Sequence, residues 1–270
     1  FNPNYLVSTD DGATFTYGGR LLSWPRRSEG DPRFTGISGG RPYLKYAQQG
    51  DDTIHIVTTE DHPSSYDNSL YHGFIRGGQL HHSDGRVIGP LSRTTETPTR
   101  PTDLTCVFRG DTDHVAWMCD VHVDREGRPR VVFSVQRNGG AGRGKRNNPA
   151  DGMDLRYHHA RWDGVTWQVH EIAHAGTRLY AGEDDYVGLA AIDPQHPDTV
   201  FISTNADPKT GAPLISLNDG RRHWEIYRGE STDQGRTWEW IAITRDSTAD
   251  NLRPIIPIWS EAGGRRIVLW

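Results

Sequence analysis

Histidine, asparagine and tyrosine side chains that can move a proton or bind a sugar are concentrated in residues 60–72. This segment contains His62, Asn68, Tyr71 and His72 at the start of a predicted inner strand. Imidazole and phenol groups act as general acids and bases in enzymes. Both histidines could therefore serve as acid, base or hydrogen-bond donor to a sugar. Either could equally be a structural histidine.

A second group of this kind alternates along one predicted strand. By parity, Tyr157, His159 and Arg161 share one face of the strand, and His158 and Trp162 share the other. One of these faces must pack against the neighbouring unit of the fold. The other face is then the candidate functional face, and the alternation alone does not distinguish the two.

Arginine dominates the basic residues, since Lys and Arg total 30 and only Lys45, Lys145 and Lys209 are lysines. Arginine binds carboxylate, sulfate and phosphate groups bidentately. Arg41 and Arg253 each stand directly before a proline at the end of a long predicted loop, where they could bind an acid. Each could instead tie loop carbonyls together, and a GC-rich genome would also produce an arginine bias.

Evidence for a metal ion is weak. The acidic run 183–185 precedes Tyr186, and it could hold a cation or sugar hydroxyls, although an acidic loop tip would look the same. Neither His81-His82 nor His158-His159 has a spacing that specifies zinc. The sequence predicts no definite cofactor and allows a structural divalent cation, Ca or Zn.

The elements that must position these residues are strands. Gly 30, Pro 16, Trp 9 and Tyr 10 favour turns and strands, and no convincing amphipathic helix interrupts them. Four-stranded units recur every ~65–85 residues, which predicts an all-β fold of β-propeller blades, about four to five of them. The predicted strands are 43–47, 53–59, 70–75, 115–123, 130–135, 155–162, 166–172, 187–192, 199–204, 223–229, 237–243 and 254–259.

Turn lengths assign the two ends of these units. Tight turns at Asp11-Gly12, Gly77-Gly78, Asp163-Gly164 and Gln234-Gly235 join third to fourth strands, so they lie at one end. Long ordered loops more often carry function than short ones. The opposite end is therefore the expected ligand face, with the long connections 24–40, 60–68, 89–113, 138–152, 174–185, 205–221 and 245–252.

One octapeptide pattern occurs twice, in residues 8–15 and 231–238. Both copies read S-x-D-x-G-x-T followed by an aromatic residue, which is the Asp-box or BNR pattern. We expect the Asp and Ser side chains to hydrogen-bond the turn backbone, the Gly to adopt a positive φ and the aromatic ring to pack beneath the hairpin. This pattern is structural and carries no chemistry of its own.

Composition and charge exclude several classes of protein. The 270 residues carry a net charge of -5 with no long block of either sign, which argues against a duplex nucleic-acid binder. No run of about 18 apolar residues is present, so no membrane partner is expected. Cys106 and Cys119 allow one disulfide at most. We interpret 1–270 as a single domain, an internal piece truncated at both ends, because neither end has a closing element.

Several strings together resemble a known family. The chain looks like BNR-repeat propellers related to ulvan lyases and rhamnose–glucuronate lyases, within the sialidase-like superfamily. The Asp-box part is unspecific, whereas the two strings around 68–73 and 160–164 are moderately specific. The strings are Asn2-Pro3-Asn4, Arg41-Pro42-Tyr43, Ile54-His55, His62-Pro63, Asn68-Ser69-Leu70-Tyr71-His72-Gly73, Ala160-Arg161-Trp162-Asp163-Gly164 and Asn251-Leu252-Arg253-Pro254.

The resemblance implies a seven-bladed propeller in the intact protein and β-elimination at a uronic acid. Such chemistry needs a group that neutralises the C5 carboxylate, a base for the C5 proton and an acid for the leaving oxygen. The family carries its principal His, Tyr and Arg on blades that precede this chain. We expect His72, Tyr157 and Arg161 as catalytic candidates, with His72 first. The substrate-binding candidates are Arg41, His62, Asn68, Tyr71, Tyr186 and Arg253.

The leading hypothesis is a secreted or periplasmic polysaccharide lyase, or a related glycoside hydrolase, that acts on an acidic uronate- or rhamnose-containing polysaccharide. Two alternatives stay open. A sialidase-type hydrolase would need three arginines that converge on one carboxylate. A non-catalytic glycan-binding propeller would show aromatic platforms and arginines without a base near the C5 proton.

Overall fold

The computed structural model describes residues 3–23, 41–63, 66–91, 99–137, 153–181, 185–258 and 267–270. In these ranges the chain is all-β, with four antiparallel sheets and a short 3-10 helix, η3 (Pro101–Asp103). The first sheet is the hairpin of β1 (Asn4–Val7) and β2 (Thr16–Arg20). No helix in these ranges is both long and apolar enough to cross a membrane.

Three larger sheets follow, each built from strands that are consecutive in the chain. The second sheet has the order β3-β4-β5-β6-β7, and β8 pairs with β5; the third has the order β12-β11-β10-β9, and the fourth β13-β14-β15-β16. Their strands are β3 (Leu44–Gln49), β4 (Thr53–Thr58), β5 (Leu70–Arg76), β6 (Gln79–His82), β7 (Val87–Pro90), β8 (Thr105–Phe108), β9 (His114–Val123), β10 (Pro129–Arg137), β11 (Leu155–Trp162), β12 (Trp167–Gly176), β13 (Ala190–Ile192), β14 (Thr199–Thr204), β15 (Glu225–Glu230) and β16 (Glu239–Ala242).

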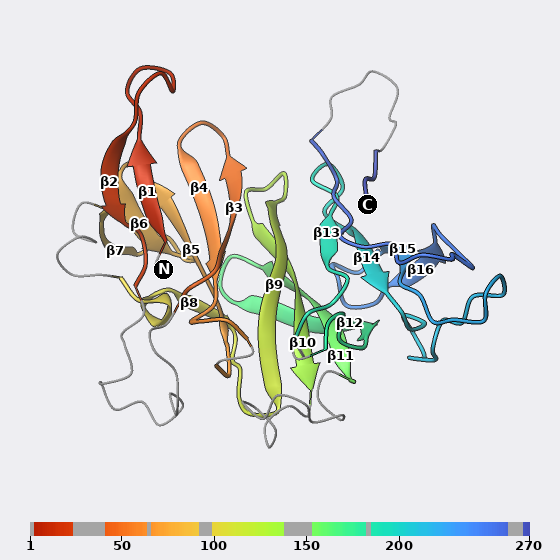
Figure 1. Cartoon of the computed structure of the whole chain (residues 1–270). Helices are drawn as coiled ribbons and strands as arrows, with labels where there is room; N and C mark the ends of the chain where they lie inside the picture. The colour runs from red at the N-terminus through yellow and green to blue at the C-terminus, as the bar shows by residue number, and fades with distance from the viewer. Residues whose placement is uncertain are drawn as a thin grey trace.

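The larger sheets succeed one another across the molecule, as Figure 1 shows from β3 through β9 to β13. One apolar core lies between the second and third sheets, where Val57 and Leu70 pack with Val131 and Phe133. A second core lies between the third and fourth sheets. Because β10 is covered on both faces, its residues from Val131 to Val135 are all buried, which explains their nearly continuous apolar run.

Most of the expected strands are present in the structure, and the differences lie mainly in strands that were not expected. The predictions for 155–162 and 199–204 match β11 and β14 to the residue. The expected strands do not include β1, β2, β6, β7 or β8, and the long connection expected at 89–113 contains η3 and β8. The expected strand 254–259 appears in the described residues only as an isolated bridge between Ile255 and Leu269. The expected loops 24–40 and 138–152 lie outside the described residues.

Both copies of the repeated octapeptide form the expected hydrogen bonds. In the second copy, Ser231 Oγ accepts from the Gly235 amide at 2.8 Å, and Asp233 Oδ1 accepts from the Thr237 amide at 2.9 Å. Gly235 has φ 89°, as expected. The aromatic positions differ, because Trp238 is 6% exposed in the core and Phe15 is 61% exposed. The expectation that both rings pack beneath their hairpins is therefore wrong for Phe15.

The two cysteines do not form a disulfide. Cys119 is buried in β9, and Cys106 lies in β8 with intermediate exposure. Burial raises the pKa of the Cys119 thiol to about 12. Cys119 is therefore a small core residue, and the single bridge that the sequence allowed is not made.

Candidate active site

Four aromatic rings meet at one end of the second and third sheets. They come from the residue before β3, the loop after β4, strand β9 and the segment before β13. His62 Nε2 lies 3.3 Å from the Tyr186 hydroxyl. The His62 ring also lies 5.7 Å from the Tyr43 ring and 5.4 Å from the Trp117 ring, measured between centroids. Tyr43 and Trp117 are in edge contact at 4.8 Å. We call Tyr43, His62, Trp117 and Tyr186 the His62 cluster. It lies at the end of the sheets opposite the tight turns, where a ligand face was expected.

Arg41 extends the His62 cluster towards solvent. Its guanidinium carbon lies 4.7 Å from the centre of the Tyr43 ring, in a cation–π contact, and the residue is exposed. A hollow of about 400 Å³ is lined by Arg41, Tyr43 and the start of β1, among other residues. A positive charge held flat on an aromatic ring beside open space is suited to bind a carboxylate or sulfate.

The backbones of Arg41 and His62 share one anchor, the Asp61 carboxylate. Asp61 Oδ1 accepts hydrogen bonds from the Arg41 amide at 3.0 Å and from the His62 amide at 2.7 Å. Asp61 is 3% exposed, and its other oxygen, Oδ2, is buried without a hydrogen-bond partner. Burial raises the pKa of this carboxyl, although the two amides oppose the shift. Asp61 thus anchors the backbones of Arg41 and His62 to each other.

Asn68 and Tyr71 hold the same loop closed. The Asn68 side chain donates to the Asp61 carbonyl at 2.6 Å and accepts from the Asp61 amide at 3.0 Å. The Tyr71 hydroxyl donates to Glu60 Oε1 at 2.8 Å, and burial followed by the charge of Glu60 raises its pKa. Both side chains are buried, so they support the loop that carries His62 and do not face a ligand themselves.

His72, the first catalytic candidate, is fully buried in a chain of hydrogen bonds. Trp167 Nε1 donates to Ser83 Oγ at 3.0 Å, so the Ser83 hydroxyl is free to donate to His72 Nδ1 at 2.8 Å. His72 Nε2 then donates to His55 Nδ1 at 3.0 Å, and His55 Nε2 donates to Gln49 Oε1 at 2.8 Å. Burial and the neighbouring His55 hold the pKa of His72 well below its usual value. This places His72 in a structural network that connects β3 with β12.

Ser83→Ala tests the structural role of this network. The substitution removes the hydroxyl that accepts from Trp167 and donates to His72, and leaves both groups without this partner. We expect the free energy of unfolding to fall by about 1 to 3 kcal/mol. Chemical denaturation monitored by circular dichroism would measure this, with Val165→Ala, which shortens an 84% exposed side chain, as a control. An unchanged unfolding free energy would contradict the network.

Tyr157, the second catalytic candidate, is also enclosed. Its hydroxyl lies 2.9 Å from the Leu189 carbonyl and 2.8 Å from the Ser203 carbonyl, and the side chain is 0% exposed. Burial raises the pKa of this phenol well above its usual value. The position fastens β11 to the fourth sheet and keeps the phenol protonated.

Arg161, the third catalytic candidate, lies at the tight-turn end, away from the His62 cluster. Its Nη2 donates to Gln234 Oε1 at 2.6 Å, inside the second octapeptide turn, where Gln234 has φ 66°. Next to it, His159 is fully buried against Trp238, and neither of its ring nitrogens has a hydrogen-bond partner. The face of β11 that carries these residues is therefore packed, and so is the opposite face, where Ala160 and Trp162 are buried.

Arg161→Gln should lower the free energy of unfolding by about 1 to 3 kcal/mol, because the variant loses a charged, buried hydrogen bond to the turn. It should leave catalytic activity unchanged, since no residue of the His62 cluster is touched. Thermal unfolding and an activity assay on the same preparation would check both points. A loss of turnover without a loss of stability would restore Arg161 as a catalytic candidate.

Tyr186 and Arg253 approach the site along neighbouring segments. Tyr186 precedes β13 and belongs to the His62 cluster. The Arg253 amide donates to the Gly188 carbonyl at 2.8 Å, two residues from Tyr186 in the chain. Arg253 has φ 58°, an uncommon value for a residue other than glycine, and its side chain is exposed. The structure therefore places both substrate-binding candidates at the long-loop end.

Three residues of the site were not selected from the sequence: Tyr43, Asp61 and Trp117. Tyr43 and Asp61 lie within two residues of the candidates Arg41 and His62, and this proximity is the only signal for them in the sequence. Trp117 lies in the middle of β9 and enters the site only because that strand lies beside β3. No metal cluster of three or more His, Cys, Asp or Glu side chains occurs in the described residues. Of the acidic run, only Asp185 falls within the described ranges.

No family profile matches the chain, and no curated protein matches it. Its fold is similar to two solved structures of ulvan lyase, a polysaccharide lyase. One, bound to GlcA(1-4)Rha3S, has a TM-score of 0.57 and 15% identity over 89% of this chain and 50% of the lyase. The other has a TM-score of 0.56 and 16% identity over 93% of this chain and 53% of the lyase.

The chain thus spans about half the length of the ulvan lyase structures that it matches. An endo-arabinase from Bacteroides thetaiotaomicron also matches over 94% of this chain at 13% identity, but with a TM-score of only 0.36. At these identities the likeness concerns the fold alone. It agrees with the all-β architecture and with the ulvan lyase part of the resemblance noted in the sequence.

Proposed function

We propose that this chain contributes consecutive blades of a β-propeller, seven-bladed when intact, that acts as a polysaccharide lyase on an acidic polysaccharide. The fold likeness to ulvan lyase supports the architecture. The uronate in the ligand of one of those structures suggests the substrate class for this chain. Such a substrate is extracellular, so we also propose that the protein is secreted or periplasmic.

The observation that carries the proposal is the His62–Tyr186 pair, 3.3 Å apart, in a cluster whose Tyr43 ring carries the Arg41 guanidinium. In this proposal Arg41 binds the uronate carboxylate, and its positive charge stabilises the negative charge that builds up on the carboxylate as the C5 proton leaves. Neutral His62 takes that proton as the base. The electron pair of the C5–H bond forms the C4–C5 double bond, the C4–O bond breaks, and Tyr186 protonates the leaving oxygen.

The short distance within the pair has two consequences for this mechanism. A base and an acid that lie side by side approach the sugar ring from the same face. The base can then remove the C5 proton and the acid can protonate the leaving oxygen on that face, so syn elimination is favoured. After the step, the imidazolium and the phenolate are in hydrogen-bond range of each other. A direct proton transfer from His62 to Tyr186 then restores both groups for the next turnover.

Product analysis tests the proposal. The protein is mixed with ulvan, rhamnogalacturonan, gum arabic and heparinoid polysaccharides, and the ultraviolet absorbance of the unsaturated uronate is followed together with reducing ends. The expected result is a rise in absorbance that matches the reducing ends and is lost in Arg41→Ala, while Arg161→Gln retains it. Reducing ends without absorbance would make the protein a hydrolase. Binding without either signal would make it a glycan-binding module.

A further inference from the structure

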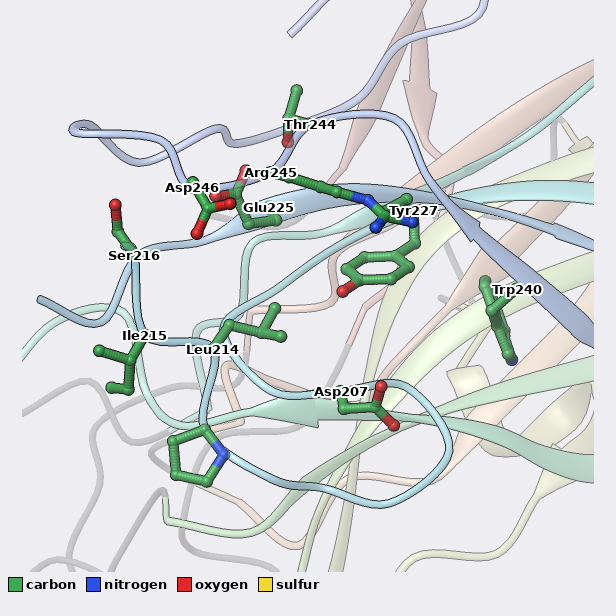
Figure 2. A pocket seen from close by; sticks show the side chains of 12 residues that line it. Asp207, Leu214, Ile215, Ser216, Glu225, Tyr227, Trp240, Thr244, Arg245 and Asp246 are labelled. Atoms are coloured by element: carbon green, nitrogen blue, oxygen red, sulfur yellow. The ribbon is translucent and has the colours of Figure 1, made fainter. Parts of the chain in front are cut away.

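A second hollow, of about 470 Å³, lies on the fourth sheet and shares no residue with the His62 cluster. Figure 2 shows its lining, with Tyr227 and Trp240 on one side and Asp207 on another, and with Arg245 extending alongside the Tyr227 ring. The wall is completed by Leu214, Ile215 and Ser216 of the β14–β15 connection and by Glu225, Thr244 and Asp246.

The strand register places both aromatic rings on one face of the β15–β16 pair. Tyr227 is opposite Ala242 and Trp240 is opposite Gly229, so their side chains emerge on the same side. A Cβ atom at Gly229 would come within 2.5 Å of the Trp240 ring. The glycine therefore lets the indole lie flat across the sheet, where it forms an aromatic surface beside Tyr227.

The opposite wall is fixed by its own hydrogen bonds. Asp207 Oδ1 accepts from the amides of Lys209 and Thr210 at 3.0 and 2.8 Å. The Pro208 carbonyl accepts from the His174 amide at 2.9 Å, which joins this loop to β12. At the far rim, Asp246 Oδ1 accepts from the Leu217 amide at 2.8 Å. The hollow is thus preformed and needs no rearrangement to take up a ligand.

Donors and acceptors without partners face this space. Within the described part of the chain, the Tyr227 hydroxyl, the Trp240 indole N–H and the Arg245 guanidinium make no hydrogen bond or ion pair, although Arg245 is close enough to influence the Tyr227 phenol electrostatically. The hydrogen bonds of Asp207 all go to Oδ1, so its second oxygen is available as an acceptor. A ligand that carries both donors and acceptors could pair with all of these groups.

We propose that this hollow is a binding site for a neutral sugar unit, separate from the His62 cluster. Sugar hydroxyls both donate and accept, as Arg245, Tyr227 and Asp207 together require, and the apolar C–H face of a sugar ring suits the Tyr227–Trp240 surface. The lining carries three carboxylates, Asp207, Glu225 and Asp246, against the single charge of Arg245. This balance disfavours a uronate or a sulfated sugar.

NMR titration of the ¹⁵N-labelled protein tests this proposal. The probes are rhamnose, xylose, galactose and cellobiose as neutral sugars, with glucuronate and tetramethylammonium as the anionic and cationic comparisons. The expected result is a shift of the Trp240 indole resonance and of the amides of Asp207, Ser216 and Arg245 with a neutral sugar. Binding should weaken about tenfold or more in Arg245→Ala and in Asp207→Asn, which keeps the Oδ1 acceptor of the turn.

Two controls separate this site from the rest of the molecule. Ile241→Ala changes an exposed residue on the other face of β16 and should leave binding unchanged. His62→Ala should also leave binding unchanged, so failure of the lyase proposal would not affect this result. No shift with any neutral sugar would overturn the proposal. So would a stronger response to glucuronate or to tetramethylammonium.

Discussion

Tyr186→Phe should lower kcat for polysaccharide cleavage by about 10²- to 10⁴-fold, because the variant keeps the ring in the His62 cluster and loses only the proton for the leaving oxygen. His62→Ala should cause a loss of similar size by removing the base. Substrate binding should change less than turnover, since Arg41 keeps its place over Tyr43. Steady-state kinetics by absorbance of the unsaturated product would measure kcat and KM separately.

The double variant provides a sharper criterion. If His62 and Tyr186 act as one unit, removing both should cost little more than removing either, because each is useless without the other. Independent, multiplicative losses would contradict the shared proton cycle. Full activity in Tyr186→Phe would exclude the phenol as the acid. Ile241→Ala, which changes an exposed residue outside the His62 cluster, is a suitable control for the effect of a substitution on folding.

Acidification should destabilise the protein progressively below pH 6.5, because several histidines are buried in the neutral form. Burial lowers the pKa of His55 to about 4 and that of His159 to about 3. In the unfolded chain these groups titrate near 6.5, so the unfolded state takes up protons first as the pH falls. Their contribution to stability is complete above pH 6.5 and is lost progressively down to the folded values. The expected loss is about 3 kcal/mol or more for each of the two.

His159→Leu isolates one of these contributions. The imidazole is fully buried against Trp238 and makes no hydrogen bond, so leucine removes the titration without breaking a bond. The variant should be at least as stable as the parent at pH 7 and should lose about 4 kcal/mol less on going to pH 3. Urea unfolding at a series of pH values would show this. Identical pH profiles in both proteins would contradict the assignment.

The fold was more predictable than the site, for reasons that particular residues show. The alternation in the first half of β11, the β-branched and aromatic run of β14 and the turn residues at Gly77-Gly78 and Gln234-Gly235 are local signals. Strand positions and the two ends of the sheets therefore followed directly. In contrast, β8 forms because Cys106 and its neighbours pair with β5, a contact between distant parts of the chain. Its own sequence gives no periodic pattern strong enough to predict it.

The candidate site shows where residue type is insufficient. The sequence favoured His72 over His62 as the catalytic histidine, but the structure encloses His72 between Ser83 and His55 and places His62 in contact with Tyr186. The alternation along β11 correctly predicts that Tyr157 and Arg161 share one face of the strand. It cannot say what covers that face, because a packed face and a ligand-binding face have the same two-residue period. The place of Trp117 in the site depends on how β9 packs against β3, and no local sequence pattern predicts that packing.

The shared Asp61 anchor has a consequence for how the specificity of this site can change in evolution. Arg41 and His62 come from different segments, yet both depend on one carboxylate, so their separation is inherited as a unit. Asn68 closes the same loop from the other side. Substitutions or insertions after His62 and before Asn68 can therefore alter which saccharides are accepted while the backbones of Arg41 and His62 keep their shared anchor. A change at Asp61 itself would disturb both groups at once.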